Sequence, residues 1–276
     1  GTLAVSADGA LGTVAGGTDV LPGGTLLLTN AITYATAEPL SISGPGAAGA
    51  GALSSNNGET WPNAVTLGAD AAIRSVTAAR TLTLSGNVDA GGNNLTLGGA
   101  GDIVASGVIS GLNAIVDASG SVRFSGASAN TLSGLVEVVN GLLLLDKTGV
   151  AACAGNLTVG DGSGGEEARL LQANQVPDTA TVSILNGALF NLNDLNETVG
   201  LLNITGGTAQ SGTATLTLAG NVTGTSSAAG SGIIAGNLDL GGASRNFIVP
   251  DGPGAIDLDV TAIISGNGGI TKLDTG

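Results

Sequence analysis

The sequence has no histidine and no methionine, a single cysteine, and few aromatic (2%) or charged (10%) residues. Without histidine, the chain lacks the usual base of a serine or cysteine catalytic triad and the commonest metal ligand. One cysteine cannot form a disulfide within the chain. Its apolar setting, Val150-Ala-Ala-Cys-Ala154, predicts a buried and unreactive thiol, because a reactive cysteine needs a nearby cation.

Clustered positive charge and long apolar runs are also missing. Lys and Arg number 7 against 21 Asp and Glu, which gives a net charge of −14. A phosphate-binding surface needs clustered basic residues, so we predict no nucleic-acid partner. No stretch approaches the roughly 18 apolar residues of a transmembrane helix, so we predict no membrane span in this segment. Because the chain starts at Gly1 without Met or a signal peptide, we expect a processed form or a fragment.

Small residues and short strand signals fill the sequence instead. It contains 49 glycines among 276 residues, and its hydrophobic content of 42% argues against disorder. Glycine has no three-residue period, which excludes collagen. Apolar and polar residues alternate in segments such as Thr81-Leu-Thr-Leu84, where the two leucines share one face. Helical periodicity is nearly absent, so the sequence predicts an all-β fold.

Segments recur in the same order in both halves of the chain, which indicates a repeat architecture. The spacing between corresponding segments changes by about one solenoid coil, roughly 20–25 residues, from one pair to the next. A solenoid tolerates such changes, because a whole coil can be added or lost while its neighbours restack. We therefore predict two diverged copies of one unit, about residues 1–134 and 135–276. The clearest pairs are Thr81-Leu-Thr-Leu-Ser-Gly-Asn-Val88 with Thr215-Leu-Thr-Leu-Ala-Gly-Asn-Val222, Asn94-Leu-Thr-Leu-Gly-Gly99 with Asn237-Leu-Asp-Leu-Gly-Gly242, and Ile109-Ser-Gly111 with Ile264-Ser-Gly266.

The predicted fold is a right-handed parallel β-helix, a single rod of stacked coils over residues 1–276. Leu, Val and Ile stack inward at the ordinary interstrand spacing of about 4.8 Å, whereas Gly and Asn suit the corners. Parallel connections within one sheet are overwhelmingly right-handed. At about 20–25 residues per coil, the chain would form about 11–14 coils. A left-handed hexapeptide helix is the structural alternative, but no six-residue period is sustained.

These segments resemble the autotransporter-associated β-strand repeat of large bacterial surface proteins, and they cover nearly the whole chain. The resemblance implies a right-handed parallel β-helix outside the cell, used as a stalk, adhesin or passenger, and it implies no catalytic residues. One departure is that no C-terminal β-barrel translocator follows Gly276. The segments that carry the resemblance include Gly1-Thr-Leu-Ala-Val5, Glu38-Pro-Leu-Ser-Ile-Ser-Gly44, Val65-Thr-Leu-Gly68, Val139-Asn-Gly-Leu-Leu-Leu144, Leu157-Thr-Val-Gly-Asp-Gly162 and Ile264-Ser-Gly-Asn-Gly-Gly-Ile-Thr-Lys272.

Paired carboxylates are the main candidates for chemistry, because glycoside hydrolysis uses two of them. Asp257 and Asp259 are two residues apart and would share one strand face, and Glu166 is adjacent to Glu167. The competing interpretation is solvated charge on a strand or loop, which we favour. The glycine-rich acidic run 160–167 fits either a flexible corner loop or a weak cation site, and we favour the corner loop.

Two aromatic residues could bind sugars. Trp61 and Tyr34 lie in loop-like sequence, where an exposed ring stacks on a sugar and a buried ring fills the end of a core. Two isolated aromatics do not define a carbohydrate site. A polysaccharide lyase would also gather basic residues and carboxylates in a cleft, whereas the five arginines show no clustering in the sequence. They are Arg74, Arg80, Arg123, Arg169 and Arg245.

From these observations we predict no catalytic, cofactor-binding or metal-binding residues and no cofactor. The expected function is a non-enzymatic extracellular structural rod, a segment of a bacterial surface adhesin, stalk or filament. The alternative is a carbohydrate-binding or carbohydrate-cleaving β-helix of the lyase or tailspike type. Neither end of the sequence resembles a cap, so the expected partners are neighbouring copies or further repeats stacked end to end, with surface glycans as a further candidate.

Overall fold

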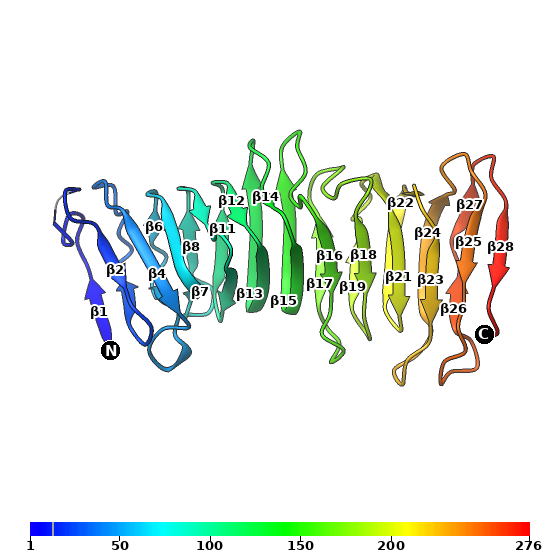
Figure 1. Cartoon of the computed structure of the whole chain (residues 1–276), viewed down its shortest axis with the longest axis horizontal. Helices are drawn as coiled ribbons and strands as arrows, with labels where there is room; N and C mark the ends of the chain where they lie inside the picture. Colours follow the sequence, from blue (N-terminus) through cyan, green and yellow to red (C-terminus); the bar gives the residue numbers. More distant parts are fainter. Residues whose placement is uncertain (13) are drawn as a thin grey trace. The chain divides into compact units, whose positions relative to one another are not determined.

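The structure, a computed structural model, describes residues 1–12 and 14–276. Over these residues the chain folds into 28 strands and one 3-10 turn, Ala47–Gly49. The strands between successive coils pair in parallel and build a β-solenoid of about 12 turns (Figure 1). This confirms the predicted all-β parallel β-helix and the predicted range of coil number. No helix of the described part of the chain is long and apolar enough to cross a membrane.

The chain divides into two compact units, each described by itself here. The first comprises Gly1–Leu135 and Gly141–Leu143, and the second comprises Val136–Asn140 and Leu144–Gly276. Strand β15 (Leu135–Lys147) contributes residues to both units. The correspondence between these units and the two sequence copies stays a prediction.

The first unit contains three parallel ladders. One joins β1, β3, β5, the end of β7, β10 and the start of β13. A second joins β2, β4, the start of β7, β9, β12 and β14, and a third joins β6, β8, β11 and the end of β13. The strands are β1 (Thr2–Val5), β2 (Thr18–Val20), β3 (Thr25–Leu28), β4 (Leu40–Gly44), β5 (Leu53–Ser55), β6 (Thr60–Trp61), β7 (Val65–Ser75), β8 (Thr81–Leu84), β9 (Val88–Asp89), β10 (Asn94–Gly99), β11 (Asp102–Ala105), β12 (Ile109–Gly111), β13 (Asn113–Gly126) and β14 (Thr131–Leu132).

The second unit repeats this arrangement. Its ladders join β16, β18, β21, β23, β25 and β28; β17, β19, β22, β24 and β26; and β20, β22, β24 and β27. The strands are β16 (Asn156–Val159), β17 (Glu167–Leu170), β18 (Thr181–Ile184), β19 (Leu189–Asn191), β20 (Glu197–Val199), β21 (Leu201–Thr205), β22 (Thr208–Leu218), β23 (Val222–Thr225), β24 (Gly232–Asp239), β25 (Arg245–Ile248), β26 (Leu258–Val260), β27 (Ile263–Ser265) and β28 (Ile270–Leu273).

Apolar side chains stack in register inside each unit. In the second unit one such column contains Leu157, Val182, Leu202 and Val222, all fully buried. In β8 of the first unit, Leu82 and Leu84 point inward and the intervening threonines are partly exposed, as the alternation predicts. Each fully buried Val, Leu or Ile stabilises the fold by about 1.5–3 kcal/mol. The stacked columns therefore hold consecutive coils together.

Two of the longer strands go beyond the predicted short segments. Strands β7 and β13 each supply residues to two ladders, so the chain turns a corner without leaving the sheet. The sequence predicted a strand over residues 121–124, whereas β13 runs from Asn113 to Gly126. Hydrogen bonding to the neighbouring coil, which a local pattern does not include, extends the strand around the bend.

Candidate functional site

The two candidate sugar-binding aromatics lie in the core of the first unit. Trp61 in β6 and Tyr34 are both fully buried, and their rings stack with centroids 5.0 Å apart. The hydroxyl of Tyr34 accepts a hydrogen bond from the main-chain N of Leu11 at 2.8 Å. Trp61 is in register with Leu84, an inward position of β8. The rings therefore fill the core, and neither presents a face to a sugar.

Glu166 and Glu167 point to opposite faces. Glu166 is only 4% exposed, whereas Glu167 lies on the outer side of β17. Adjacent strand residues alternate between faces, so these carboxylates cannot work on one bond as an acid–base pair. The expectation of solvated charge is also wrong for Glu166, because the position just before β17 faces the interior.

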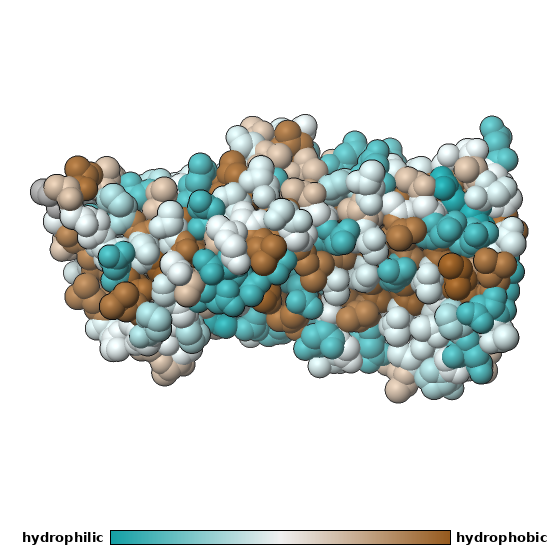
Figure 2. Space-filling view, in the orientation of Figure 1, coloured by the Kyte–Doolittle hydropathy of each residue, from teal (hydrophilic) through white to brown (hydrophobic). Residues whose placement is uncertain are grey.

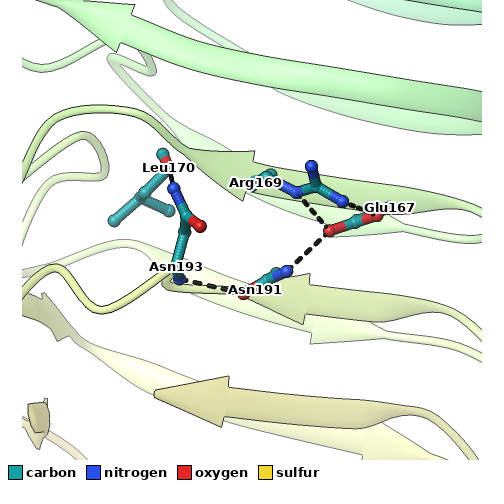
Figure 3. A network of polar contacts seen from close by, with 5 residues as sticks. All are labelled: Glu167, Arg169, Leu170, Asn191 and Asn193. Carbon is teal, nitrogen blue, oxygen red and sulfur yellow. Dashed lines mark hydrogen bonds and ion pairs between the residues drawn. The ribbon is translucent and has the colours of Figure 1, made fainter. Parts of the chain in front are cut away.

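Glu167 belongs to a surface network that joins two coils (Figure 3). Its two carboxylate oxygens accept hydrogen bonds from Arg169 Nε at 2.8 Å and Nη2 at 2.9 Å. Asn191, in register with Arg169 on β19, donates to Glu167 Oε1 at 2.8 Å. Asn193 continues the contact between the coils by donating to the carbonyl of Leu170 at 3.1 Å. The hydrogen bonds with Glu167 raise the pKa of Arg169, and the group ties β17 to β19.

Asp257 and Asp259 differ in their surroundings in the second unit. Asp257 precedes β26 and is 7% exposed, whereas Asp259 lies exposed within β26. Asp257 Oδ1 accepts hydrogen bonds from Ser226 Oγ at 2.6 Å and from the main-chain N of Gly252 at 2.9 Å. The bond from Ser226 is the largest cause of the lowered pKa of Asp257. The two carboxylates therefore do not share one exposed strand face, and Asp257 fixes a loop.

The candidate arginines contact their own fold. Arg74 pairs with Asp117 at 2.8 Å, and Arg169 pairs with Glu167. Arg245 donates through its guanidinium to the carbonyls of Leu218, Ala219 and Leu240. These groups hold neighbouring coils together, since most of their acceptors lie about one coil away in the sequence.

Sequence reasoning missed a set of buried polar residues in the second unit. Lys147, Gln175 and Glu197 are at most 1% exposed, and Cys153 is fully buried beside them. The side-chain amide of Gln175 accepts from Lys147 N at 2.8 Å and donates to Lys147 O at 3.0 Å. Glu197 Oε2 accepts from Gln175 N at 2.6 Å. These residues connect three successive parts of the chain through main-chain hydrogen bonds.

Burial shifts the proton affinities of this set. Desolvation raises the pKa of Glu197 to about 7 and lowers the pKa of Lys147 to about 8. Desolvation, followed by the charge of Glu197, raises the pKa of Cys153 to about 12. This confirms the prediction of a buried Cys153 and leaves no thiolate nucleophile at neutral pH. A signal for Glu197 was available, because Glu197-Thr-Val199 alternates like a strand with its first residue on the apolar face.

The described residues contain no group of three or more Cys, Asp or Glu side chains placed to hold a metal ion. Two hollows are apolar and lie at terminal coils. One of about 380 Å³ is lined by residues of β1, β2 and β3, among them Leu3, Val20 and Leu26. The other, about 400 Å³, is lined by residues of β25 to β28 and the loop before β26, among them Phe247 and Ile270. Both are open edges of the core, and their apolar lining lacks convergent acid and base groups.

The face shown in Figure 2 mixes hydrophilic and weakly hydrophobic residues with smaller apolar patches. Large apolar side chains with high exposure gather in the terminal coils, where Leu21 is 70% and Ile263 is 73% exposed. Comparisons with protein-family models, with curated proteins and with solved structures found no match.

Proposed function

We propose that this chain is a non-enzymatic structural segment of an extracellular bacterial surface adhesin, stalk or filament. The observation that supports this most is how the fold uses its own reactive groups. Asp257 and Glu167 are hydrogen-bonded to neighbouring coils, and Trp61 is buried against Tyr34. Groups held in this way stabilise the solenoid and are not free to converge on a substrate. The sequence resemblance to bacterial surface repeats supplies the extracellular location in this proposal.

The expected partners are further coils of the same kind. In the first unit β1 pairs on one side with β3, and in the second unit β28 pairs on one side with β25. Strand edges with unpaired backbone and exposed apolar side chains are templates for association. We propose that coils from the same polypeptide or from a neighbouring copy cover these edges.

Two experiments test the proposed function. Incubation of the purified chain with a panel of acidic polysaccharides should give no turnover, and a glycan array should give no specific binding. Turnover that is lost in Asp257→Ala or Glu167→Ala would instead establish the carbohydrate-cleaving alternative. Sedimentation of the chain across a concentration series should show end-to-end association, whereas a stable monomer with protected amides in the terminal coils would contradict the proposed partners.

A further inference from the structure

The corner between β16 and β17, residues 160–166, contains a buried charged oxygen without a partner. This acidic corner reads Gly160-Asp-Gly-Ser-Gly-Gly-Glu166. Glu166 is 4% exposed, and its Oε2 has no hydrogen-bond partner. The oxygen lies against the start of the same loop, since a Cβ added to Gly160 would sit 3.4 Å from it. A buried carboxylate oxygen with neither donor nor counter-ion is costly, so its presence calls for an explanation.

A second corner carboxylate shows how the fold otherwise solves this problem. In the first unit Glu59 precedes β6 just as Glu166 precedes β17, and Glu59 is fully buried. Its Oε2 accepts hydrogen bonds from the main-chain N atoms of Asn56 at 3.1 Å and Asn57 at 3.0 Å and from the hydroxyl of Ser55. Its Oε1 accepts from Ala31 N at 3.0 Å. Donors of the protein itself therefore saturate this carboxylate.

The donors of the acidic corner point elsewhere. Ser163 N donates to Asp161 Oδ1 at 2.8 Å, and Gly165 N donates to Gly187 O at 3.3 Å. The hydrogen bond from Ser163 also lowers the pKa of Asp161, which keeps this carboxylate ionised at neutral pH. The loop thus combines two carboxylates with the main-chain carbonyls of a glycine-rich segment and offers no donor to Glu166 Oε2.

We propose that the acidic corner binds a calcium ion through Glu166, Asp161 and main-chain carbonyls of residues 160–165. All of these ligands are oxygens, and calcium accepts six to eight of them from carboxylates, carbonyls and water with flexible geometry. Magnesium fits less well, because it requires near-ideal octahedral geometry and loses its water reluctantly. Carbonyls and water must complete the site, since the described residues hold no cluster of three acidic side chains. The net charge of −14 further concentrates cations around the chain.

Binding would fasten the corner to the next coil. The added Cβ of Gly160 would also lie 2.9 Å from the Cβ of Ala188, which shows how closely the acidic corner packs on the corner after β18. A cation on Glu166 neutralises the buried charge at this contact. The bound state is then more stable than the free state, and the gain grows with calcium concentration.

The test uses the full chain, stripped with a chelator and titrated with calcium chloride by calorimetry, with thermal unfolding measured in parallel. We expect one calcium site and a rise in Tm with calcium that magnesium at the same concentration does not reproduce. Glu166→Gln should abolish the heat and the calcium-dependent Tm shift. Asp161→Asn, a change at an exposed side chain, should weaken binding by about tenfold or more.

Glu167→Gln is the matched control, because this neighbour lies on the outer face and bonds to Arg169. It should retain the wild-type calcium affinity, and circular dichroism should show the wild-type fold for all three variants. Loss of binding in Glu167→Gln alone would place the ion on the outer face and overturn the proposal. A wild-type chain without calcium heat or Tm shift, together with a Glu166→Gln variant more stable than wild type, would also overturn it. That pair of results would mean that Glu166 is simply a buried charge.

Discussion

Arg74 and Asp117 are 43 residues apart in the chain, yet their side chains form an ion pair of 2.8 Å. They lie on β7 and β13, and β10 runs between these strands. The position of β10 in register with both is Gly98, so no side chain separates the two charged groups. The pair therefore spans a whole coil and joins three coils of the first unit.

Gly98 is expected to be intolerant of any side chain. An added Cβ would lie 1.8 Å from the main-chain O of Asp117, so Gly98→Ala must push two strands apart. Overpacking of this kind typically lowers the free energy of unfolding by about 1–3 kcal/mol. Urea unfolding of the variant measures this loss. Gly92→Ala is the control, because a Cβ at Gly92 meets nothing within 4 Å, and an equal loss in both variants would contradict the argument.

Replacement of Trp61 should show that this ring supports the core. Trp61→Ala removes a fully buried side chain that stacks on Tyr34, and such truncations cost about 3–5 kcal/mol of unfolding free energy. Tyr34→Phe keeps the ring and loses only the hydrogen bond from Leu11 N, so it should cost about 1 kcal/mol. Chemical denaturation compares the two. Wild-type stability in Trp61→Ala would mean that the ring is solvated in solution.

Glu197 should make the fold less stable as the pH rises from acid to neutral. Its pKa is about 7 in the folded state, above its ordinary value of 4.5. Between these values the folded state binds more protons than the unfolded state, so the free energy of unfolding falls with rising pH. The shift corresponds to about 3 kcal/mol as an upper bound. Unfolding of the wild type from pH 4 to pH 7 measures the slope.

The control for this slope is Glu197→Gln. The amide does not titrate, so the decline between pH 4.5 and 7 should flatten in this variant, even though it also loses an acceptor for Gln175 N or Thr198 N. A variant that keeps the full wild-type slope would assign the effect to another group.

Lys147 should act in the opposite direction at higher pH. Its folded pKa of about 8 lies below the ordinary 10.5, so above pH 8 the unfolded state binds more protons and stability rises. Above pH 9 Cys153 opposes this rise, because its folded pKa of about 12 exceeds the ordinary 9.0. We therefore expect an increase from pH 8 to pH 9 and little change above. Lys147→Met should remove the increase, and Cys153→Ala should let it continue beyond pH 9.

Much of the fold could be predicted from the sequence because its determinants are local. The alternation in Thr81-Leu-Thr-Leu84 places Leu82 and Leu84 inside, as the structure shows, because successive strand residues face opposite sides. Recurring segments at coil-sized spacing indicate a solenoid, since each coil needs the same inward residues. The same rule could have separated Glu166 from Glu167, because adjacent strand residues cannot share a face.

Only the tertiary structure decides which residues meet across coils. The contact of Arg74 with Asp117 depends on the exact lengths of the two coils between them, and a one-residue change in either would shift every partner. Likewise, Glu197 is buried because it is in register with Leu216 on the neighbouring coil, and Glu59 is satisfied because its corner turns its amides inward. The sequence by itself therefore determined the inward and outward residues and the coil size. The register between coils, which places charges and donors next to one another, arises only when the coils stack.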